Sequence, residues 1–260
     1  MSSDRIHAPA AARACDWLVP DWPVPSFVQA LTTTRRGGVS TGPYRSLNLA
    51  DHVGDSERVV NDNRERLFRL ADLPAMPFWL NQVHGVGVVD ARSAARGSVA
   101  DASFTGSDQV VCAALTADCL PVLLYDRRNQ RIAAVHAGWR GLAAGVIAAT
   151  IARMNSRGDD LLAWLGPAIG PGRFEVGAEV RAQFLAHDPR SAAAFVPSAN
   201  AGRWLADIYE LARQRLGEAA VTSVYGGGFC TVSEADRFYS YRRDGVTGRM
   251  ATLIWMTGNR

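Results

Sequence analysis

The chain has 260 residues, of which 48% are hydrophobic, and this content supports a folded domain with a sizeable core. All 28 basic residues are arginines, and the absence of lysine excludes a Schiff-base lysine, pyridoxal phosphate chemistry and the phosphate loop of P-loop NTPases. The formal charge of +3 is small, and the arginines are dispersed among 25 acidic residues. This balance disfavours a nucleic-acid partner and is compatible with an anionic small-molecule substrate.

Targeting and cysteine patterns favour a reducing, aqueous compartment. Residues 1–25 lack the continuous apolar core of a secretory signal, and no later stretch reaches the roughly 20 apolar residues that span a bilayer. The four cysteines are scattered without a C-x-x-C pair, so we expect reduced thiols, a cytoplasmic protein and no membrane partner. Because the sequence contains no repeat or linker, we interpret residues 1–25 as an N-terminal extension and residues 26–260 as a single catalytic domain.

The first third of the chain predicts one strand, a long ordered loop and one amphipathic helix. Residues 27–33 have the apolar character of a strand and are followed by a segment rich in glycine, serine and proline. Residues 56–70 place Val60 and Leu67 on one face of a helix, which ends before Pro74. Shorter strand pieces are expected at 78–80 and 86–89.

Three continuous apolar runs follow, over residues 109–115, 120–125 and 132–135, and their length suits strands of a sheet that is covered on both faces. Helices and strands then alternate, which favours an α/β architecture over a β-sandwich. The expected helices span 141–154, 176–185 and 204–216, and the expected strands span 161–165, 221–225 and 250–255. The aromatic and Arg-rich segment 238–245 is interpreted as an edge strand entering a turn.

His84, Cys119 and His136 each stand where an apolar strand ends. Strand ends are where α/β folds gather ligand-binding groups, so three imidazole and thiol side chains on one sheet rim form a metal hypothesis. Their separations along the chain match no short local zinc signature. The alternative from the residues alone is that the histidines are satisfied polar groups and the cysteine packs as a small hydrophobe.

Residues 136–141 run from a strand into a helix through Gly138 and Gly141. Such a turn presents free backbone N–H groups to an anion, and Arg140 adds a planar fork of donors suited to phosphate. The alternative is a tight strand-to-helix turn in which Trp139 packs on the core and Arg140 forms a surface ion pair. In the early loop, residues 46–49 and His52 suit either a functional loop or turns that satisfy their own backbone.

Taken together, the segments 81–85, 116–122 and 135–141 resemble the YfiH-type family, also labelled polyphenol oxidase or laccase-domain proteins. The resemblance extends over nearly the whole chain after about residue 25. It includes residues 46–49, 166–171, 174–177 and 238–248. One departure is Gly172-Arg173, where some members carry cysteines, and it affects no inferred ligand.

The resemblance implies an α/β fold of layered mixed β-sheets flanked by helices, of the CNF-toxin-like cysteine hydrolase type. It implies a zinc site made by His84, Cys119 and His136. It also implies purine nucleoside phosphorylase activity on adenosine, inosine and methylthioadenosine, with adenosine deaminase activity at the same site. The older laccase label implies copper instead, and a further role in the family is the removal of wrongly built peptidoglycan precursors.

Two neutral imidazoles and one thiolate would leave a fourth position of Zn²⁺ open, as in catalytic rather than structural sites. Such a metal lowers the pKa of bound water to about 7, which would supply the hydroxide for deamination. Phosphate would be held by Arg140 with Gly138 and Gly141, or by an early arginine, Arg45 or Arg64. Asn48 and Asp118 are candidates for orienting the substrate or the ligands.

Three rival interpretations remain at this point. A copper polyphenol oxidase needs several histidine-rich sites, and five histidines are too few to fill them. Alternatively, Cys119 is a nucleophile activated by His136 or His84 that cleaves an amide in a cell-wall precursor. A purely structural zinc module is disfavoured because a fourth protein ligand is missing. The sequence leaves open the preferred nucleoside and whether the protein is a monomer or a homodimer.

Overall fold

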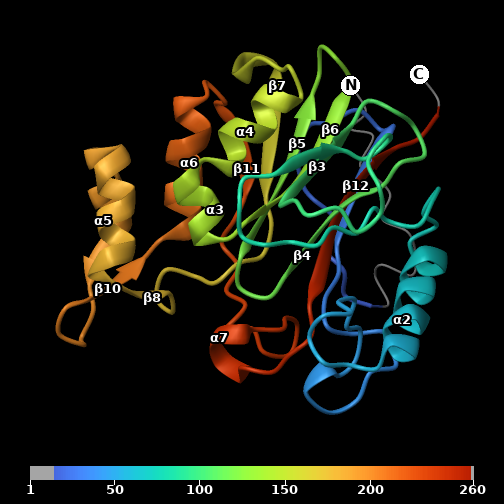
Figure 1. Cartoon of the computed structure of the whole chain (residues 1–260), viewed down its shortest axis with the longest axis horizontal. Coiled ribbons are helices and arrows are strands. Elements are labelled where there is room, and N and C mark those ends of the chain that lie inside the picture. Colours follow the sequence, from blue (N-terminus) through green and yellow to red (C-terminus); the bar gives the residue numbers. More distant parts are fainter. Residues whose placement is uncertain (1–14, 259–260) are drawn as a thin grey trace.

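The computed structural model describes residues 15–258, which form three β-sheets with helices on their outer sides (Figure 1). The largest sheet has six strands in the order β11-β7-β5-β6-β3-β2. Its strands are β2 Val88–Asp90, β3 Ala102–Thr105, β5 Leu120–Asp126, β6 Arg131–Ala137, β7 Leu161–Leu165 and β11 Ser223–Gly226. β5 is antiparallel to both β6 and β7, whereas β7 pairs with β11 and β2 with β3 in parallel. The expected mixed α/β fold is therefore confirmed.

Two smaller sheets accompany it. An antiparallel sheet has the order β1-β12-β4, and a short one has the order β8-β10-β9. Their strands are β1 Val28–Thr32, β4 Cys112–Thr116, β12 Met250–Met256, β8 Glu175–Gly177, β9 Phe195–Pro197 and β10 Arg203–Ala206. The helices are α2 Glu57–Leu70, α3 Trp139–Ala144, α4 Val146–Arg153, α5 Ala178–His187, α6 Ile208–Glu218 and α7 Tyr241–Asp244. Short 3₁₀ turns lie at Gly42–Tyr44, Gly158–Asp160 and Pro189–Ala194.

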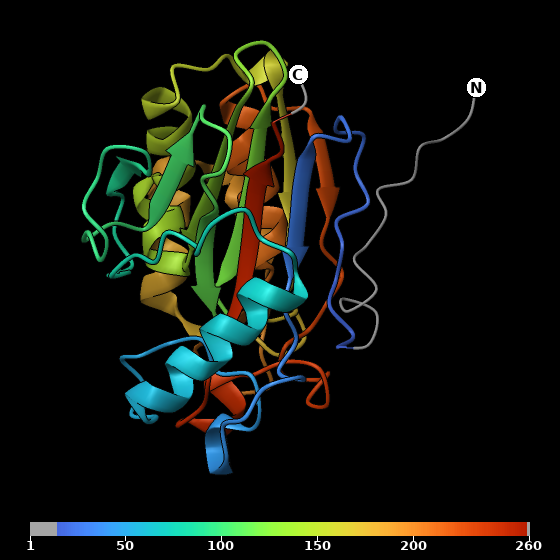
Figure 2. The same ribbon diagram turned by 90° about the vertical axis from the view of Figure 1, so that its right-hand side faces the viewer.

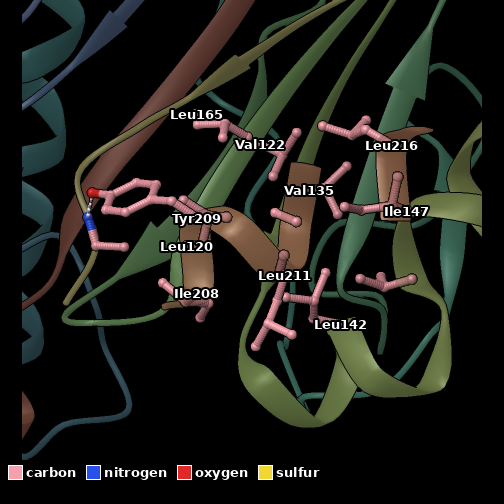
Figure 3. Close-up of a cluster of buried hydrophobic side chains, with 14 of the residues drawn as sticks. Leu120, Val122, Val135, Leu142, Ile147, Leu165, Ile208, Tyr209, Leu211 and Leu216 are labelled. Atoms are coloured by element: carbon pink, nitrogen blue, oxygen red, sulfur yellow. Dashed lines mark hydrogen bonds between the residues drawn. The ribbon is translucent and has the colours of Figure 1, made fainter. Parts of the chain in front are cut away.

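The central strand β5 is buried on both faces, as its continuous apolar run predicts. Alternate residues point to opposite sides, so Leu120, Val122 and Leu124 share a core cluster with residues of α3, α4 and α6. Figure 3 shows Leu120 and Val122 in this cluster. Leu123 and Tyr125 face the β1-β12-β4 sheet instead. Helices thus cover one face of the large sheet, and a second sheet covers the other.

The outer face of the β1-β12-β4 sheet is covered by α2, which crosses it obliquely in Figure 2. Leu67 of α2 packs against the cluster that contains Leu253 and Trp255 of β12. The register pairs Met250 with Thr116, so the start of β12 lies beside the end of β4. That end of the sheet leads directly to Cys119.

Several expected elements differ in type or extent. The helix expected over 141–154 is two helices, because Gly145 adopts a left-handed φ of 96° between α3 and α4. The expected helices 176–185 and 204–216 begin late, because β8 and β10 occupy their first residues. The expectation of an edge strand at 238–245 was wrong, since the Ser240 side chain caps the short helix α7.

The N-terminal extension expected over residues 1–25 lies partly outside the described residues. From residue 15 onward, this segment packs on the domain: Trp17 and Trp22 are buried, and the Leu18 N–H donates to the Thr32 carbonyl at 2.9 Å. Within the described part of the chain, no helix combines the length and the apolar character needed to cross a bilayer.

Candidate metal-binding active site

The structure brings His84, Cys119 and His136 to one point, although they come from three separate segments. His84 lies in the loop before β2, Cys119 in the turn between β4 and β5, and His136 near the end of β6. One ligand atom from each lies within 4.8 Å of the other two, and His84 Nε2 is 3.6 Å from the Cys119 Sγ. His136 is buried, Cys119 is half-buried and His84 is exposed, so the cluster opens to solvent on one side.

Strand pairing places two of these side chains. The antiparallel register of β5 and β6 sets Leu120 opposite Ala137 and Pro121 opposite His136. Cys119, immediately before β5, therefore lies beside the end of β6. This convergence depends on the hairpin and not on any local spacing, which explains why the sequence has no short zinc signature.

Asp101 holds both histidines in place. Its carboxylate accepts hydrogen bonds from His136 Nδ1 at 2.8 Å, from the His84 N–H at 2.8 Å and from the Gly85 N–H at 2.6 Å. His136 therefore carries its proton on Nδ1 and presents Nε2 to the other ligands, which is the arrangement found behind metal-bound histidines. The backbone of His84 adopts a φ of 61°, a left-handed conformation that these bonds stabilise.

The charged groups of the cluster favour the thiolate of Cys119. Burial alone raises the pKa of this thiol, but His136 and His84 outweigh burial and lower the pKa to about 6. Burial lowers the pKa of His136, whereas Cys119 and Asp101 raise it to about 9. Burial likewise opposes ionisation of Asp101, and its hydrogen bonds nevertheless keep its pKa below the usual range. The thiolate is the form of cysteine that binds metals and attacks electrophiles.

Two glycines leave room for this cluster. A Cβ on Gly138 would lie 2.8 Å from His84 Cδ2 and 3.0 Å from the Cys119 Sγ, and a Cβ on Gly141 would lie 2.7 Å from the Gly85 carbonyl oxygen. Both residues were predicted to bind phosphate. In the structure both glycines provide clearance, because a side chain at either position would displace His84, Cys119 or the loop of His84.

Gln82 ties the loop of His84 to the edge of β4. Its side-chain amide donates to the Leu115 carbonyl and accepts from the Leu115 N–H, both at 2.8 Å. The amide thus takes the place of a backbone pairing partner. The loop of His84 is therefore attached to the β1-β12-β4 sheet, whereas His136 belongs to the six-stranded sheet and Cys119 lies between the two.

A cavity of about 530 Å³ opens beside the three ligands. Its polar wall includes Arg140, Arg242 and Arg249, and its aromatic wall includes Trp139 and Tyr241. The other residues that line it are His52, Gln82, Leu115, Thr116, Ala117, Asp118, Ile169, Phe174 and Ile208. The aromatic side chains of this wall suit a flat ring, and the arginines suit an anionic group.

Asp118 lines the cavity, as expected of a residue that orients substrate, but its carboxylate is already engaged. It accepts from the Thr231 hydroxyl and from the Arg242 N–H, both at 2.6 Å. Its backbone has a φ of 94°, and these bonds stabilise that conformation in the turn before Cys119. Asp118 thus fixes the turn that carries the thiol.

Other predicted site residues lie outside the cavity wall. Arg64 donates to the Leu49 carbonyl and to Asp51, and Arg45 is exposed beside the first 3₁₀ turn. Asn48 is fully buried, and its side-chain oxygen accepts from the Arg249 N–H at 3.0 Å. It therefore bonds to the backbone of a cavity residue and does not itself line the cavity.

Asp101 and Arg249 were not predicted individually from the sequence. Asp101 precedes β3, a short strand with no clear alternation, and its role depends on the pairing of β3 with β6. Arg249 directly follows the segment 238–248 that carries the family resemblance, which was the nearest available signal. Arg140 does line the cavity, where it stacks on Trp139 with its Cζ 4.4 Å from the ring centroid.

Comparisons with known proteins identify the family and support the fold. Residues 29–257 match the family model described as multi-copper polyphenol oxidoreductase laccase. A purine nucleoside phosphorylase of Pseudomonas aeruginosa is 57% identical over 92% of this chain and 98% of its own length. The purine nucleoside phosphorylase YfiH of Escherichia coli is 50% identical, again over 92% and 98%.

Solved structures show the same fold. A protein of Neisseria meningitidis superposes with a TM-score of 0.88 at 51% identity, covering 93% of this chain and 99% of that one. YlmD of Geobacillus stearothermophilus superposes with a TM-score of 0.81 at 30% identity, covering 89% and 92%. The chain therefore belongs to the laccase-like YfiH family, whose curated relatives at 50–57% identity are named purine nucleoside phosphorylases.

Proposed function

We propose that the chain is a zinc-dependent purine nucleoside phosphorylase that cleaves adenosine, inosine and methylthioadenosine in the cytoplasm and deaminates adenosine at the same site. The observation that carries the proposal is the group formed by His84, Cys119 and His136 on the wall of a cavity with aromatic and arginine side chains. The names of the relatives supply the reaction class.

The three side chains fit a divalent metal. Two imidazole nitrogens and one thiolate within 4.8 Å form a donor set that zinc accepts, and three protein ligands leave one position for a reactant. The absence of a Cβ on Gly138 provides the space in which an ion would lie. When bound, zinc would activate water or polarise a substrate oxygen.

The protein's own groups would prepare that site. Asp101 keeps the proton of His136 on Nδ1 and so leaves Nε2 free as a donor to the metal. Trp139 and Tyr241 offer flat surfaces for a purine, and the arginines of the cavity offer positive charge for phosphate. The carboxylate of Asp118, already engaged by Thr231 and Arg242, would hold the Cys119 turn rigid during the reaction.

Two alternatives use the same residues. A multi-copper oxidase needs several metal sites, whereas residues 15–258 contain one cluster of three potential ligands. A cysteine hydrolase that edits peptidoglycan precursors would use the lowered pKa of Cys119 directly, with His136 as its base. The open coordination position and the names of the relatives favour the phosphorylase.

The test is the substitution Cys119→Ala, with Cys230→Ala as the matched control outside the cluster. We expect Cys119→Ala to lose bound zinc and nucleoside cleavage together, and Cys230→Ala to keep both. Zinc is measured by elemental analysis, and the products of adenosine and inosine are separated by chromatography with and without phosphate. Free base with ribose 1-phosphate supports the phosphorylase. Full cleavage by metal-free Cys119→Ala protein would eliminate it.

Alkylation of Cys119 distinguishes the cysteine hydrolase from the zinc-dependent phosphorylase. A zinc-bound thiolate is shielded until the metal is chelated, whereas a nucleophilic thiol reacts in a metal-free enzyme and turnover stops. One equivalent of zinc without blue absorption also argues against the copper oxidase.

A further inference from the structure

We propose that Arg249, together with the hydroxyl of Thr116, forms the subsite that binds the phosphate oxygens in this cavity. The role of this subsite in catalysis rests on the proposed function, whereas phosphate binding at the subsite can be tested without it. It replaces Arg45 and Arg64, which do not line the cavity, and it competes with Arg140, which does.

The backbone of Arg249 is fixed from two sides. The Asn48 side-chain oxygen accepts from the Arg249 N–H at 3.0 Å. Immediately before it, a Cβ on Gly248 would lie 2.7 Å from Tyr239 Cζ and 2.9 Å from the Asn48 Cβ. This close packing holds the segment against the loop of Asn48. Arg249 is thus presented to the cavity by a rigid backbone, as a specific binding site requires.

Strand register brings Arg249 next to the metal-binding turn. Met250 pairs with Thr116, so Arg249 lies opposite Ala117 and within two residues of Cys119 along the facing chain. Arg249 and Thr116 both line the cavity that contains the three ligands. A group held by Arg249 would therefore lie beside the metal.

The guanidinium of Arg249 has donors to spare. Its Nη1 donates to the Thr247 and Gly248 carbonyls at 2.9 and 3.0 Å, whereas Nε and Nη2 have no acceptor among residues 15–258. No carboxylate within that range forms an ion pair with it. The half-buried cation faces two anionic groups, the Cys119 thiolate and the Asp118 carboxylate, but donates to neither among residues 15–258, so its remaining donors are available to a ligand.

Its neighbours in the cavity are less suitable. Arg140 and Arg242 are exposed, whereas Arg249 is half-buried. Stacking does not distinguish them, because Arg140 stacks on Trp139 and Arg249 lies over Tyr241. Exposed cations contribute less to anion binding than desolvated ones because water screens them.

Thr116 supplies an independent observation. Its residue is 2% exposed, and its hydroxyl has no hydrogen-bond partner within the described chain. Several buried polar side-chain atoms of residues 15–258 lack a partner, and among their residues Thr116 is the one that lines the cavity, where a ligand could complete its bonding. One hydroxyl donor beside a guanidinium fork matches the oxygens of phosphate.

In phosphorolysis, an oxygen of hydrogen phosphate forms a bond to C1′ of the ribose as the bond from C1′ to the purine nitrogen breaks. The bonding electron pair stays on the purine, which takes the proton of the phosphate, so the products are ribose 1-phosphate and the free base. Arg249 and Thr116 would hold the remaining phosphate oxygens and aim the attacking one. Their contribution is to the position of the nucleophile.

The experiment measures binding of inorganic phosphate to zinc-loaded protein by calorimetry, without nucleoside, and then the KM for phosphate. We expect Arg249→Gln to weaken phosphate binding roughly 30-fold or more and Thr116→Val about 3- to 10-fold. Arg153→Gln, at an exposed position on α4, removes the same charge as a control and should leave binding unchanged. Zinc content and melting temperature verify that each variant folds.

The outcomes separate this inference from the proposed function. If phosphate affinity falls in Arg140→Gln and not in Arg249→Gln, the subsite assignment is overturned while the phosphorylase stands. If wild-type protein binds phosphate through Arg249 but yields no ribose 1-phosphate, the subsite stands and the reaction does not. If wild-type protein does not bind phosphate, the inference fails.

Discussion

Gly138 offers the sharpest test of the metal site, because replacing it with alanine adds a single methyl group. The backbone at this position has φ −61° and ψ 154°, which alanine adopts without strain. The added Cβ would lie 2.8 Å from His84 Cδ2, about 0.7 Å inside the ~3.5 Å of normal carbon contact. The His84 ring must therefore move.

A shift of that size exceeds what a metal site tolerates, since ligand distances must be kept within about 0.2 Å. We expect Gly138→Ala to weaken zinc binding about 10- to 100-fold, or about 1.4–2.7 kcal/mol, the range found when the support of a ligand is lost. The melting temperature of the metal-free protein should change little, because the exposed His84 ring can rotate away when no ion holds it.

Competition with a chromophoric chelator measures the affinity, and thermal melting in excess chelator measures the fold. Gly172→Ala is the matched control, because a Cβ there would meet no atom within 4 Å. Wild-type zinc affinity in Gly138→Ala protein would refute the assignment of this space to the ion.

Two further predictions concern buried carboxylates. Asp101→Asn should weaken zinc binding about 10- to 100-fold, because an amide cannot accept all the bonds that orient His136 and the His84 loop; an unchanged affinity in the chelator assay would contradict this role. Asp126→Asn should lower the free energy of unfolding at pH 7 by about 1–2 kcal/mol. Burial opposes ionisation of Asp126, but bonds from Ser156 and Asn129 lower its pKa below the unfolded value. Its stabilisation is therefore present above about pH 4 and lost as the pH falls through the folded pKa, so urea titrations of both proteins should converge in acid. A pH-independent difference would argue against this account.

Long apolar runs predicted the fold well. The strand expected over 161–165 is β7, and the run 120–125 is β5 with one more residue, because both strands are buried on both faces. Local breaks were harder to predict: the alanine-rich helix 141–154 gives no sign of the interruption at Gly145 except the glycine itself. Short strands such as β8 and β10 depend on tertiary pairing, since β10 pairs with both β8 and β9.

The site was predictable where strand ends and the family resemblance coincide, as for His84, Cys119 and His136. It was not predictable where a role depends on tertiary pairing. Asp101 reaches the two histidines through the β3–β6 register, and Arg249 reaches the cavity through the β12–β4 register. Neither relation leaves a pattern in the neighbouring residues.

The Gln82 side chain also covers part of the exposed edge of β4. β4 is the last strand of its sheet, and its open side would offer unpaired peptide groups to any extended chain nearby. Phe78 occupies one end of that side through a backbone bond to Val111, and Gln82 occupies the other end. The segment that carries His84 therefore also covers the edge of β4, so release of this loop would expose a strand edge that promotes aggregation as well as disturb the candidate metal site.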